Sequence, residues 1–203
     1  MPAIGITGGI STGKSTFCEC LGKILPGAAF FNADEAAHAL IEVPEVKREI
    51  RAEFGRGVFL SDRNLNRTKL RAIILGDATK RRALERILHP RIRRQWRAEA
   101  KSHRNSPDFF FADIPLLYET GGETLCDRVL VVACSHKVQL ARMAQRISLN
   151  DTEAEQMIRS QMPLEEKMAR ADHVVWNDGD RAGLIEQARF LVSLWQQQTW
   201  TKR

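Results

Sequence analysis

A glycine-rich turn near the start of the chain is followed directly by a lysine and two hydroxyl residues. Gly8, Gly13, Lys14 and Ser15 match the phosphate-loop pattern G-x-x-x-x-G-K-[ST]. Glycines let such a loop bend with positive φ, so that its N–H groups and the start of the next helix can face an anion. Lys14 is expected to reach the β and γ phosphates of a nucleotide, and the Ser15 hydroxyl to ligate Mg²⁺. The predicted nucleotide contacts of this loop are Gly8, Gly9, Ile10, Ser11, Thr12, Gly13, Lys14, Ser15 and Thr16.

Two acids follow short apolar runs and are candidates for chemistry. Asp34 comes just after residues 28–32, and Asp113 ends residues 109–113. Acids at the carboxyl ends of parallel strands lie on the edge where α/β sheets bind ligands. Asp34 is therefore a candidate catalytic acid or base, although an acid in the first turn of a helix also serves as a cap. Asp113 is either a water-mediated Mg²⁺ ligand, as a Walker B acid is, or a turn acid before Pro115.

The excess of positive charge is concentrated in one segment. The formal net charge is +6, and much of the excess lies in residues 80–104. Such charge favours an anionic partner, either nucleic acid or a multiply phosphorylated small molecule. Large apolar residues recur every four positions in this segment, at Leu84, Leu88, Ile92 and Trp96. The segment is therefore interpreted as a pair of amphipathic helices with a solvated basic face, and a nucleic-acid-binding module is the alternative from another class.

The elements that must position these residues are those of a parallel sheet covered by helices. Strands are expected at residues 3–6, 28–32, 109–113, 128–134 and 173–176. Helical patterns cover residues 14–25, 44–54, 68–75, 79–88 and 137–147. Two more helices are expected to begin at residues 33 and 152, and a terminal helix is expected to run through Trp195. A further helix is expected between the third and fourth strands. This order predicts a three-layer α/β sandwich with a parallel sheet, of the P-loop NTPase kinase type, with a helical insertion and a helical lid. We expect a bend between two helices at His89-Pro90, because a residue before proline disfavours the helical conformation.

Composition narrows the class of protein. No apolar run approaches the ~20 residues of a membrane span, and no basic N-terminal region indicates a signal peptide. The cysteines, at positions 18, 20, 126 and 134, lack paired metal-binding spacing. We therefore expect a cytoplasmic protein that binds no membrane.

The classes of phosphate-loop protein can be separated further. A GTPase should carry Asn-Lys-x-Asp, which the sequence lacks, and a motor ATPase usually needs a longer chain than 203 residues. A kinase needs an acceptor pocket, an acid near the acceptor hydroxyl and cations around the transferring phosphoryl group. The helical insertion, Asp34, and Arg142 with Arg146 supply these parts. The kinase interpretation is therefore favoured.

Taken in order, these residues resemble the dephospho-CoA kinase family over nearly the whole chain. The phosphate loop is the most specific part of the resemblance. The other matching segments are Ala33-Asp34 with Ala37, Leu84-Glu85, His89-Pro90, Asp113-Ile114-Pro115-Leu116-Leu117 with Glu119, Gln145-Arg146, Gln161, Ala171-Asp172, Asn177 and Gly179. The resemblance implies phosphoryl transfer from Mg-ATP to the ribose 3′-hydroxyl of dephospho-CoA, which gives coenzyme A.

The resemblance also implies roles for individual residues. The catalytic residues would be Asp34 as general base, Lys14 on the phosphates and Arg142 from the lid. Arg142 and Arg146 would close over the phosphates and adenine, with Asn177 and Gly179 near the adenine ring. Ser15 would ligate Mg²⁺. The implied acceptor contacts are Thr7, Asp34, His89, Pro115, Leu116 and Leu117.

We expect one kinase chain over residues 1–203, with three functional regions. The nucleotide-binding core is predicted at about 1–43, 107–140 and 171–203, the CoA- or acceptor-binding insertion at about 44–106, and the lid at about 141–170. The expected partners are ATP and dephospho-CoA, with no nucleic acid, and the chain is expected to be a monomer or weak oligomer. Another nucleoside or metabolite kinase of the same fold is the alternative. Three positions depart from the family pattern: Asn32, Ser11 and Ile147-Ser148-Leu149.

Overall fold

The chain divides into two compact units. The computed structural model describes residues 2–61, 64–106, 108–147, 151–197 and 200, without the side chains of residues 146, 147 and 151. The first unit comprises Met1–Phe31 and Glu99–Arg203, and the second comprises Asn32–Ala98. Each unit has its own cluster of buried apolar side chains, so each is described by itself.

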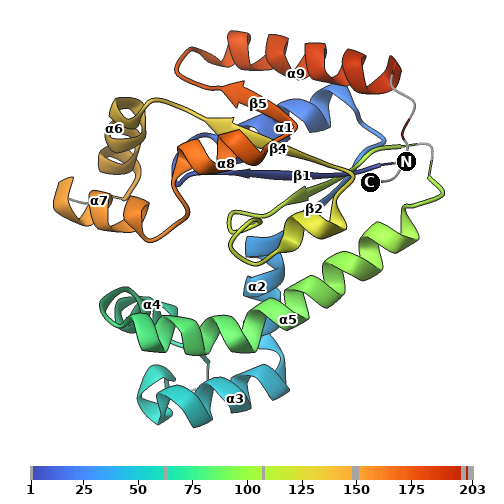
Figure 1. Cartoon of the computed structure of the whole chain (residues 1–203). Helices are drawn as coiled ribbons and strands as arrows, with labels where there is room; N and C mark the ends of the chain where they lie inside the picture. Colours follow the sequence, from blue (N-terminus) through green and yellow to red (C-terminus); the bar gives the residue numbers. More distant parts are fainter. Residues whose placement is uncertain (1, 62–63, 107, 148–150, 198–199, 201–203) are drawn as a thin grey trace. The chain divides into compact units, whose positions relative to one another are not determined.

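A five-stranded sheet organises the first unit. The strands are β1 (Ala3–Gly8), β2 (Ala29–Asn32), β3 (Phe110–Asp113), β4 (Arg128–Ala133) and β5 (His173–Trp176), in the order β2-β3-β1-β4-β5 (Figure 1). β1 pairs in parallel with both β3 and β4, and β4 pairs in parallel with β5. The carboxyl ends of these strands therefore share one edge of the sheet, which confirms the predicted parallel α/β architecture.

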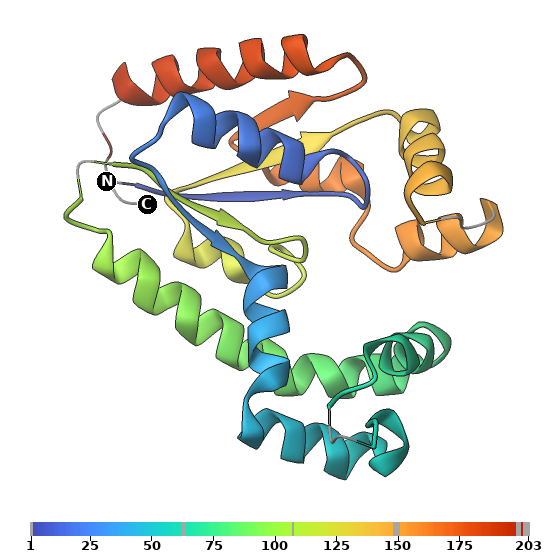
Figure 2. The same cartoon turned by 180° about the vertical axis from the view of Figure 1, so that it is seen from behind.

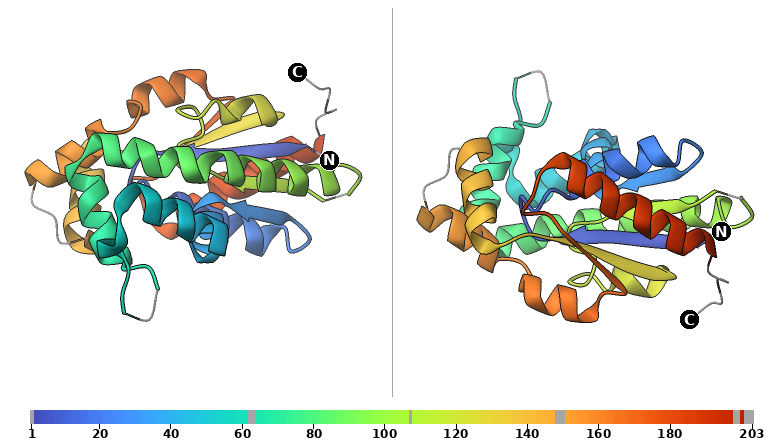
Figure 3. Two further views of the ribbon diagram at one scale, coloured as in Figure 1. Left: turned by 90° about the horizontal axis from the view of Figure 1, so that it is seen from below. Right: turned by 90° about the horizontal axis from the view of Figure 1, so that it is seen from above.

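Helices cover both faces of this sheet. α1 (Lys14–Ile24) and α9 (Arg181–Gln197) lie side by side on one face, as Figure 2 and the view from above in Figure 3 show. α8 (Leu164–Arg170) packs against β4. All of β4 after its first residue is buried, as expected for a parallel strand covered on both faces. The core on the α1–α9 face includes the fully buried side chains of Phe17, Leu21, Phe111, Ile4, Ile6, Leu130 and Trp195.

Two further helices follow β4. They are α6 (His136–Ile147) and α7 (Asp151–Arg159), and with α8 they occupy the region that the sequence predicted to be a helical lid. Between β3 and β4 we expected a helix, but the structure has only the short 3₁₀ turn η2 (Gly122–Leu125). The connection turns at Gly121, whose φ of 63° is left-handed and interrupts a helical path there.

The second unit is helical, as the sequence predicted. Its elements are α2 (Ala33–Glu42), α3 (Pro44–Phe54), the 3₁₀ turn η1 (Arg56–Val58), α4 (Arg67–Gly76) and the first part of α5 (Ala78–Ser102). Leu40 and Ile41 of α2 join the apolar cluster of α3, α4 and α5. For this reason the first boundary between the compact units falls before α2, between Phe31 and Asn32, and the second falls between Ala98 and Glu99. The division into a nucleotide-binding core, an acceptor-binding insertion and a lid remains a prediction.

The expected division into two helices at His89-Pro90 is wrong. Pro90 lies inside one continuous helix, α5. Proline removes one N–H donor from a helix and crowds the preceding turn. The guanidinium of Arg91 ties this part of α5 to α3, because its Nη1 donates to the Ile87 carbonyl at 2.7 Å while its Nη2 donates to Glu49 of α3 at 2.6 Å. Among the described residues, none of the helices is long and apolar enough to cross a membrane.

Candidate active site

The loop between β1 and α1 has the backbone conformation of a phosphate cradle. Gly13 precedes α1 with a left-handed φ of 94°. Ser11 has a φ of 57° and is the one non-glycine residue of the described chain with positive φ. Such strain costs a non-glycine residue roughly 1–2 kcal/mol and persists where the surrounding structure holds it. The first N–H groups of α1 have no acceptor within the helix, so they are available to an anion.

Side chains from distant segments hold the carbonyl oxygens of this loop. Gln139 Nε2 of α6 donates to the Ile10 carbonyl at 2.7 Å, and Asn177 Nδ2, just after β5, donates to the Thr12 carbonyl at 2.8 Å. In a planar trans peptide, the C=O of one residue and the N–H of the next point in opposite directions. Each of these bonds therefore turns the following N–H group away from the side chain that holds the carbonyl. This is the arrangement that an anion-binding loop needs.

Arg142 of α6 links the loop to the segment after β5. Its Nη1 donates to the Thr12 carbonyl at 3.3 Å, and its Nη2 donates to the Asn177 carbonyl at 2.9 Å. The Asn177 N–H in turn donates to Ala133 at the end of β4 at 2.7 Å. The fit is tight, since a Cβ on Gly13 would lie 2.0 Å from Asn177 Nδ2. The structure thus brings Arg142 and Asn177 together at the loop, as a nucleotide site would require.

The segment after Asn177 is tied to the start of α6. Asp178 Oδ1 accepts the Ser135 N–H at 2.7 Å, and this hydrogen bond lowers the pKa of the Asp178 carboxyl. Gly179 follows in the turn, and an added Cβ there would meet nothing within 4 Å. Gly179 therefore leaves open space beside it, and its predicted contact with adenine remains a prediction.

Lys14 is paired with the acid that the sequence proposed as a metal ligand. Its ammonium forms an ion pair and hydrogen bond with Asp113 Oδ1, and the two side chains are only 11% and 6% exposed. Cys18, one turn further along α1, lies 3.8 Å from Asp113 Oδ2. Burial, together with the charge of Asp113, raises the pKa of the Cys18 thiol, so it stays protonated. A phosphate on the loop would be a second anionic partner for Lys14.

The donors around the loop fit a metal that arrives with a nucleotide. Ser15 is exposed at the start of α1, and Asp113 supplies a carboxylate that is shared with Lys14. Within the described residues, no group of three or more His, Cys, Asp or Glu side chains could hold a metal. Mg²⁺ is commonly bound through one or two protein oxygens together with substrate phosphates. The residues present fit that mode, and not a resident metal held by protein alone.

Comparisons with known proteins point to one family. The sequence profile described as dephospho-CoA kinase matches residues 2–182. A dephospho-CoA kinase of Geobacillus kaustophilus is 37% identical over 95% of this chain and 96% of its own length. One from Anaeromyxobacter dehalogenans is 41% identical over 95% of this chain and 92% of its own.

The chain belongs to the dephospho-CoA kinase family. Among solved structures, a protein of Thermus thermophilus has a TM-score of 0.80 at 31% identity, with 98% of each chain covered. A dephospho-CoA kinase from Campylobacter jejuni has a TM-score of 0.70 at 25% identity, covering 94% of this chain and 95% of its own. A shikimate kinase at 12% identity, with a TM-score of 0.52, shares the fold alone. The interpretation of the chain as a P-loop kinase is thereby confirmed.

In this member of the dephospho-CoA kinase family, part of the expected acceptor segment is packed into the core. The Thr7 side chain is fully buried, and its hydroxyl donates to the Pro115 carbonyl at 3.0 Å. Leu117 is also fully buried, and its methyl group would lie 2.9 Å from a Cβ added to Gly5. Thr7 and Leu117 therefore support the segment from inside. Leu116 and Pro115 are partly exposed, and their contact with an acceptor remains a prediction.

A buried lysine of the site was missed by the sequence reasoning. Lys167 of α8 is fully buried, and its ammonium contacts the Gly8 carbonyl, the Pro115 carbonyl and Glu119. Its local pattern, Leu-Glu-Glu-Lys-Met-Ala-Arg, is that of a charged surface helix. No local signal distinguishes this lysine from a solvated one, because its partners lie 48 to 159 positions away along the chain.

Three further residues were predicted for the site: Asp34, His89 and Arg146. Asp34 and His89 belong to the second unit. Asp34 is exposed in the first turn of α2, and the Asn32 side chain caps that helix by accepting the N–H groups of Asp34 and Glu35 at 2.9 and 3.1 Å. Burial lowers the pKa of His89, so its imidazole is neutral near neutral pH. Arg146 was predicted to act in the lid, but its side chain falls outside the described residues.

Proposed function

We propose that this protein phosphorylates the ribose 3′-hydroxyl of dephospho-CoA with ATP, and so produces coenzyme A. The observation that carries the proposal is the phosphate loop, whose carbonyl oxygens are held from outside by Gln139, Asn177 and Arg142. The family membership supplies the acceptor, since the relatives that match over almost their full length are named dephospho-CoA kinase. ATP and dephospho-CoA are the proposed partners.

The loop and the cations around it would bind the triphosphate and stabilise the charge that moves during transfer. Loop N–H groups and the start of α1 face the phosphates, and Lys14 reaches the β and γ positions. A guanidinium has five N–H donors, and the described contacts of Arg142 with protein occupy two of its nitrogens. Its remaining donors can contact the transferring phosphoryl group. Preorganised cations of this kind supply a large share of catalysis in phosphoryl transfer.

Asp34 is the proposed general base. Its carboxylate is exposed, and within the described part of the chain it forms no ion pair that would hold its oxygens. Asp34 lies two residues past the end of β2, and its backbone N–H is held by the side chain of Asn32. A carboxylate held in this way could accept or orient the proton of the 3′-hydroxyl as the phosphorus is attacked.

Mg²⁺ is the proposed metal. Ser15 would hold it directly, and Asp113 through water. When bound, it would neutralise part of the charge on the nucleotide phosphates. The other regions keep their proposed roles: the helical insertion holds the CoA arm, and the lid carries arginines over the nucleotide.

The test is ADP release from Mg-ATP in the presence of single acceptors, with mass analysis of the product. The acceptors are dephospho-CoA, AMP, CMP, adenosine and a pantetheine derivative. We expect a phosphoryl gain on dephospho-CoA alone, placed on the 3′-oxygen. Turnover with a nucleoside monophosphate instead would overturn the acceptor assignment and leave the phosphate loop standing.

The role of Asp34 can be tested with a control in the same helical turn. Asp34→Asn should keep the fold and lose roughly 10²–10⁴-fold in kcat, which is the usual contribution of a general base. Glu35→Gln is the matched control, because Glu35 is also an exposed acid capped by Asn32. If the two variants show the same turnover, Asp34 is a helix-start acid and not the base.

A further inference from the structure

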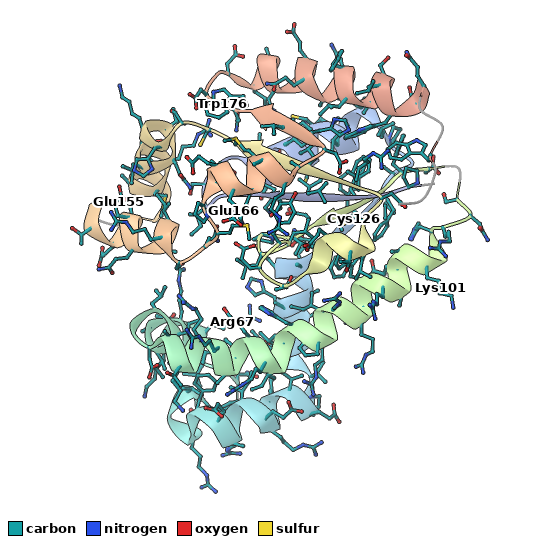
Figure 4. The ribbon with its side chains drawn as sticks, in the orientation of Figure 1. Arg67, Lys101, Cys126, Glu155, Glu166 and Trp176 are labelled. Carbon is teal, nitrogen blue, oxygen red and sulfur yellow. The ribbon has the colours of Figure 1, made fainter. Side chains whose placement is uncertain are left out.

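Lys167 is a buried cation at the meeting point of three segments of the site. It lies on α8 directly after Glu166, which Figure 4 labels. Its side chain has no exposed surface, whereas Glu165 and Glu166 beside it are exposed. The ammonium lies 3.2 Å from the Gly8 carbonyl, 3.0 Å from the Pro115 carbonyl and 2.9 Å from Glu119 Oε1.

The three contacts satisfy the ammonium completely. A lysine ammonium has three N–H donors, and here each has an oxygen acceptor. A buried charge is costly unless it is paired and hydrogen-bonded, and an apolar side chain of similar volume is often as stable. Stability alone therefore does not explain why a lysine stands at this place. A role for its N–H donors in the site explains it.

The contact with Gly8 acts on the first peptide of the phosphate loop. The carbonyl of Gly8 and the N–H of Gly9 belong to one planar unit and point in opposite directions. By holding the carbonyl, Lys167 turns the Gly9 N–H toward the opposite side, as Gln139 does for the peptide after Ile10. Lys167 thus completes a set of side chains from other segments that hold the loop carbonyls of Gly8, Ile10 and Thr12.

The other contacts extend this effect to the segment after β3. The Pro115 carbonyl accepts hydrogen bonds from both Lys167 and Thr7. Glu119 accepts from Lys167 and also from the Met162 N–H, at 3.0 Å, just before α8. One ammonium therefore fixes the phosphate loop, the Pro115 segment and the start of α8 relative to one another.

We propose that Lys167 is a positioning residue for phosphoryl transfer. It fixes the Gly8–Gly9 peptide for the nucleotide phosphates, and it fixes the Pro115 segment on which the proposed acceptor site depends. The part that concerns the acceptor rests on the proposed function. The part that concerns nucleotide binding rests on the loop geometry alone.

The experiment compares three variants with the wild-type protein. Lys167→Met keeps the length of the side chain and removes its donors. The double variant Lys167→Met, Glu119→Gln also removes the Glu119 carboxylate, which would otherwise lose its ion-pair partner. It provides the test if Lys167→Met alone fails to fold. Lys137→Met is the matched control, because Lys137 is an exposed lysine on α6. The measurements are the unfolding midpoint, the dissociation constant of ADP by calorimetry, and kcat and KM with dephospho-CoA.

The double variant should fold with a cooperative transition and bind ADP about 10-fold more weakly, with kcat reduced about 10- to 100-fold, as expected when reacting groups are misplaced. Lys137→Met should match the wild type. If the double variant has a lower unfolding midpoint but wild-type ADP binding, kcat and KM, Lys167 is only structural and the proposal is overturned. If the wild type binds ADP but does not phosphorylate dephospho-CoA, the proposed function fails, and weaker ADP binding by the double variant would still support Lys167 as a positioning residue of the loop.

Discussion

Replacement of Gly13 by alanine should destabilise the phosphate loop by an amount that the structure allows us to work out. Gly13 has a φ of 94°, and the left-handed conformation costs a residue with a Cβ roughly 1–2 kcal/mol. The new methyl group would lie 2.0 Å from Asn177 Nδ2, so the amide must move and give up its bond to the Thr12 carbonyl. Loss of one such buried bond costs about 1–3 kcal/mol, and the lower end applies here because Arg142 still contacts the same carbonyl.

The sum is about 2–4 kcal/mol, which leaves a folded protein of ordinary stability. For a chain of this size the corresponding drop in unfolding midpoint is about 4–16 °C. Calorimetric unfolding measures this drop, and binding of ADP measures the damage to the loop, which should be severe because the Gly13 N–H and the start of α1 both shift. Gly22→Ala, inside the helix that follows Gly13, is the matched control. An added Cβ there meets the Phe30 ring at an ordinary 3.7 Å, and alanine stabilises a helix interior by about 0.5–1 kcal/mol.

The clash itself can be isolated with a double variant. Asn177→Ala removes the amide that the new methyl group would meet, so the combined effect of Gly13→Ala and Asn177→Ala should be smaller than the sum of the two single effects. If Gly13→Ala unfolds within about 0.5 kcal/mol of the wild type and binds ADP normally, the close approach of Asn177 to the loop is not as described.

Two further predictions concern stability. Asn32→Ala should lower the free energy of unfolding by about 1 kcal/mol in a denaturant titration, because it removes the cap of α2, whereas Asn32→Asp should keep it; equal losses in both variants would contradict the capping role. Burial lowers the pKa of His173, whose Nε2 has no hydrogen-bond partner within the described chain. The unfolded chain therefore binds the proton more readily, and stability should fall as the pH drops below about 6.5. His173→Phe, which keeps a ring against Trp195, should reduce this dependence of the unfolding midpoint on pH. An unchanged slope would mean that other groups cause the pH dependence.

The phosphate loop and the parallel sheet could be predicted because their signals are local. The glycines, Lys14 and Ser15 lie within one short segment, and each strand is a short apolar run. The same locality explains the error at Pro90. A proline usually interrupts a helix, and only the fold shows that α5 continues through it, with the guanidinium of Arg91 on the Ile87 carbonyl and on Glu49. Tertiary contacts here override a local preference.

The function of buried polar residues was harder to predict from sequence. Thr7 lies in a run that resembles a strand, and its type is compatible with either a ligand contact or an internal hydrogen bond. The structure shows the internal bond, to Pro115. Leu117 was expected to contact the acceptor, but it is fully buried against β1. A sequence gives the residue type at the end of a strand, but not whether the side chain faces the open edge or the core.

The topology of the sheet explains which side chains around the loop were predictable. β1 is central, with β3 and β4 on either side and β5 beyond β4. Because these strands are parallel, the residues that directly follow each of them reach the same edge as the loop that follows β1. Pro115 follows β3, Gln139 and Arg142 lie on the helix that follows β4, and Asn177 follows β5. Pro115, Arg142 and Asn177 were predicted from the sequence, and the strand order also selects Gln139, which was not.

Lys167 differs from this set because it precedes a strand. It lies on α8, which leads into β5, so the rule that points to residues after the strands does not select it. It reaches the edge of the sheet from the side of α8, through the length of its side chain, and there it contacts the first carbonyl of the loop. The residues that follow the strands hold the later carbonyls of the loop, at Ile10 and Thr12. The first peptide, at Gly8, is therefore held by a helix that precedes a strand of the sheet. For this reason the contact between Lys167 and Gly8 could be inferred only from the folded structure.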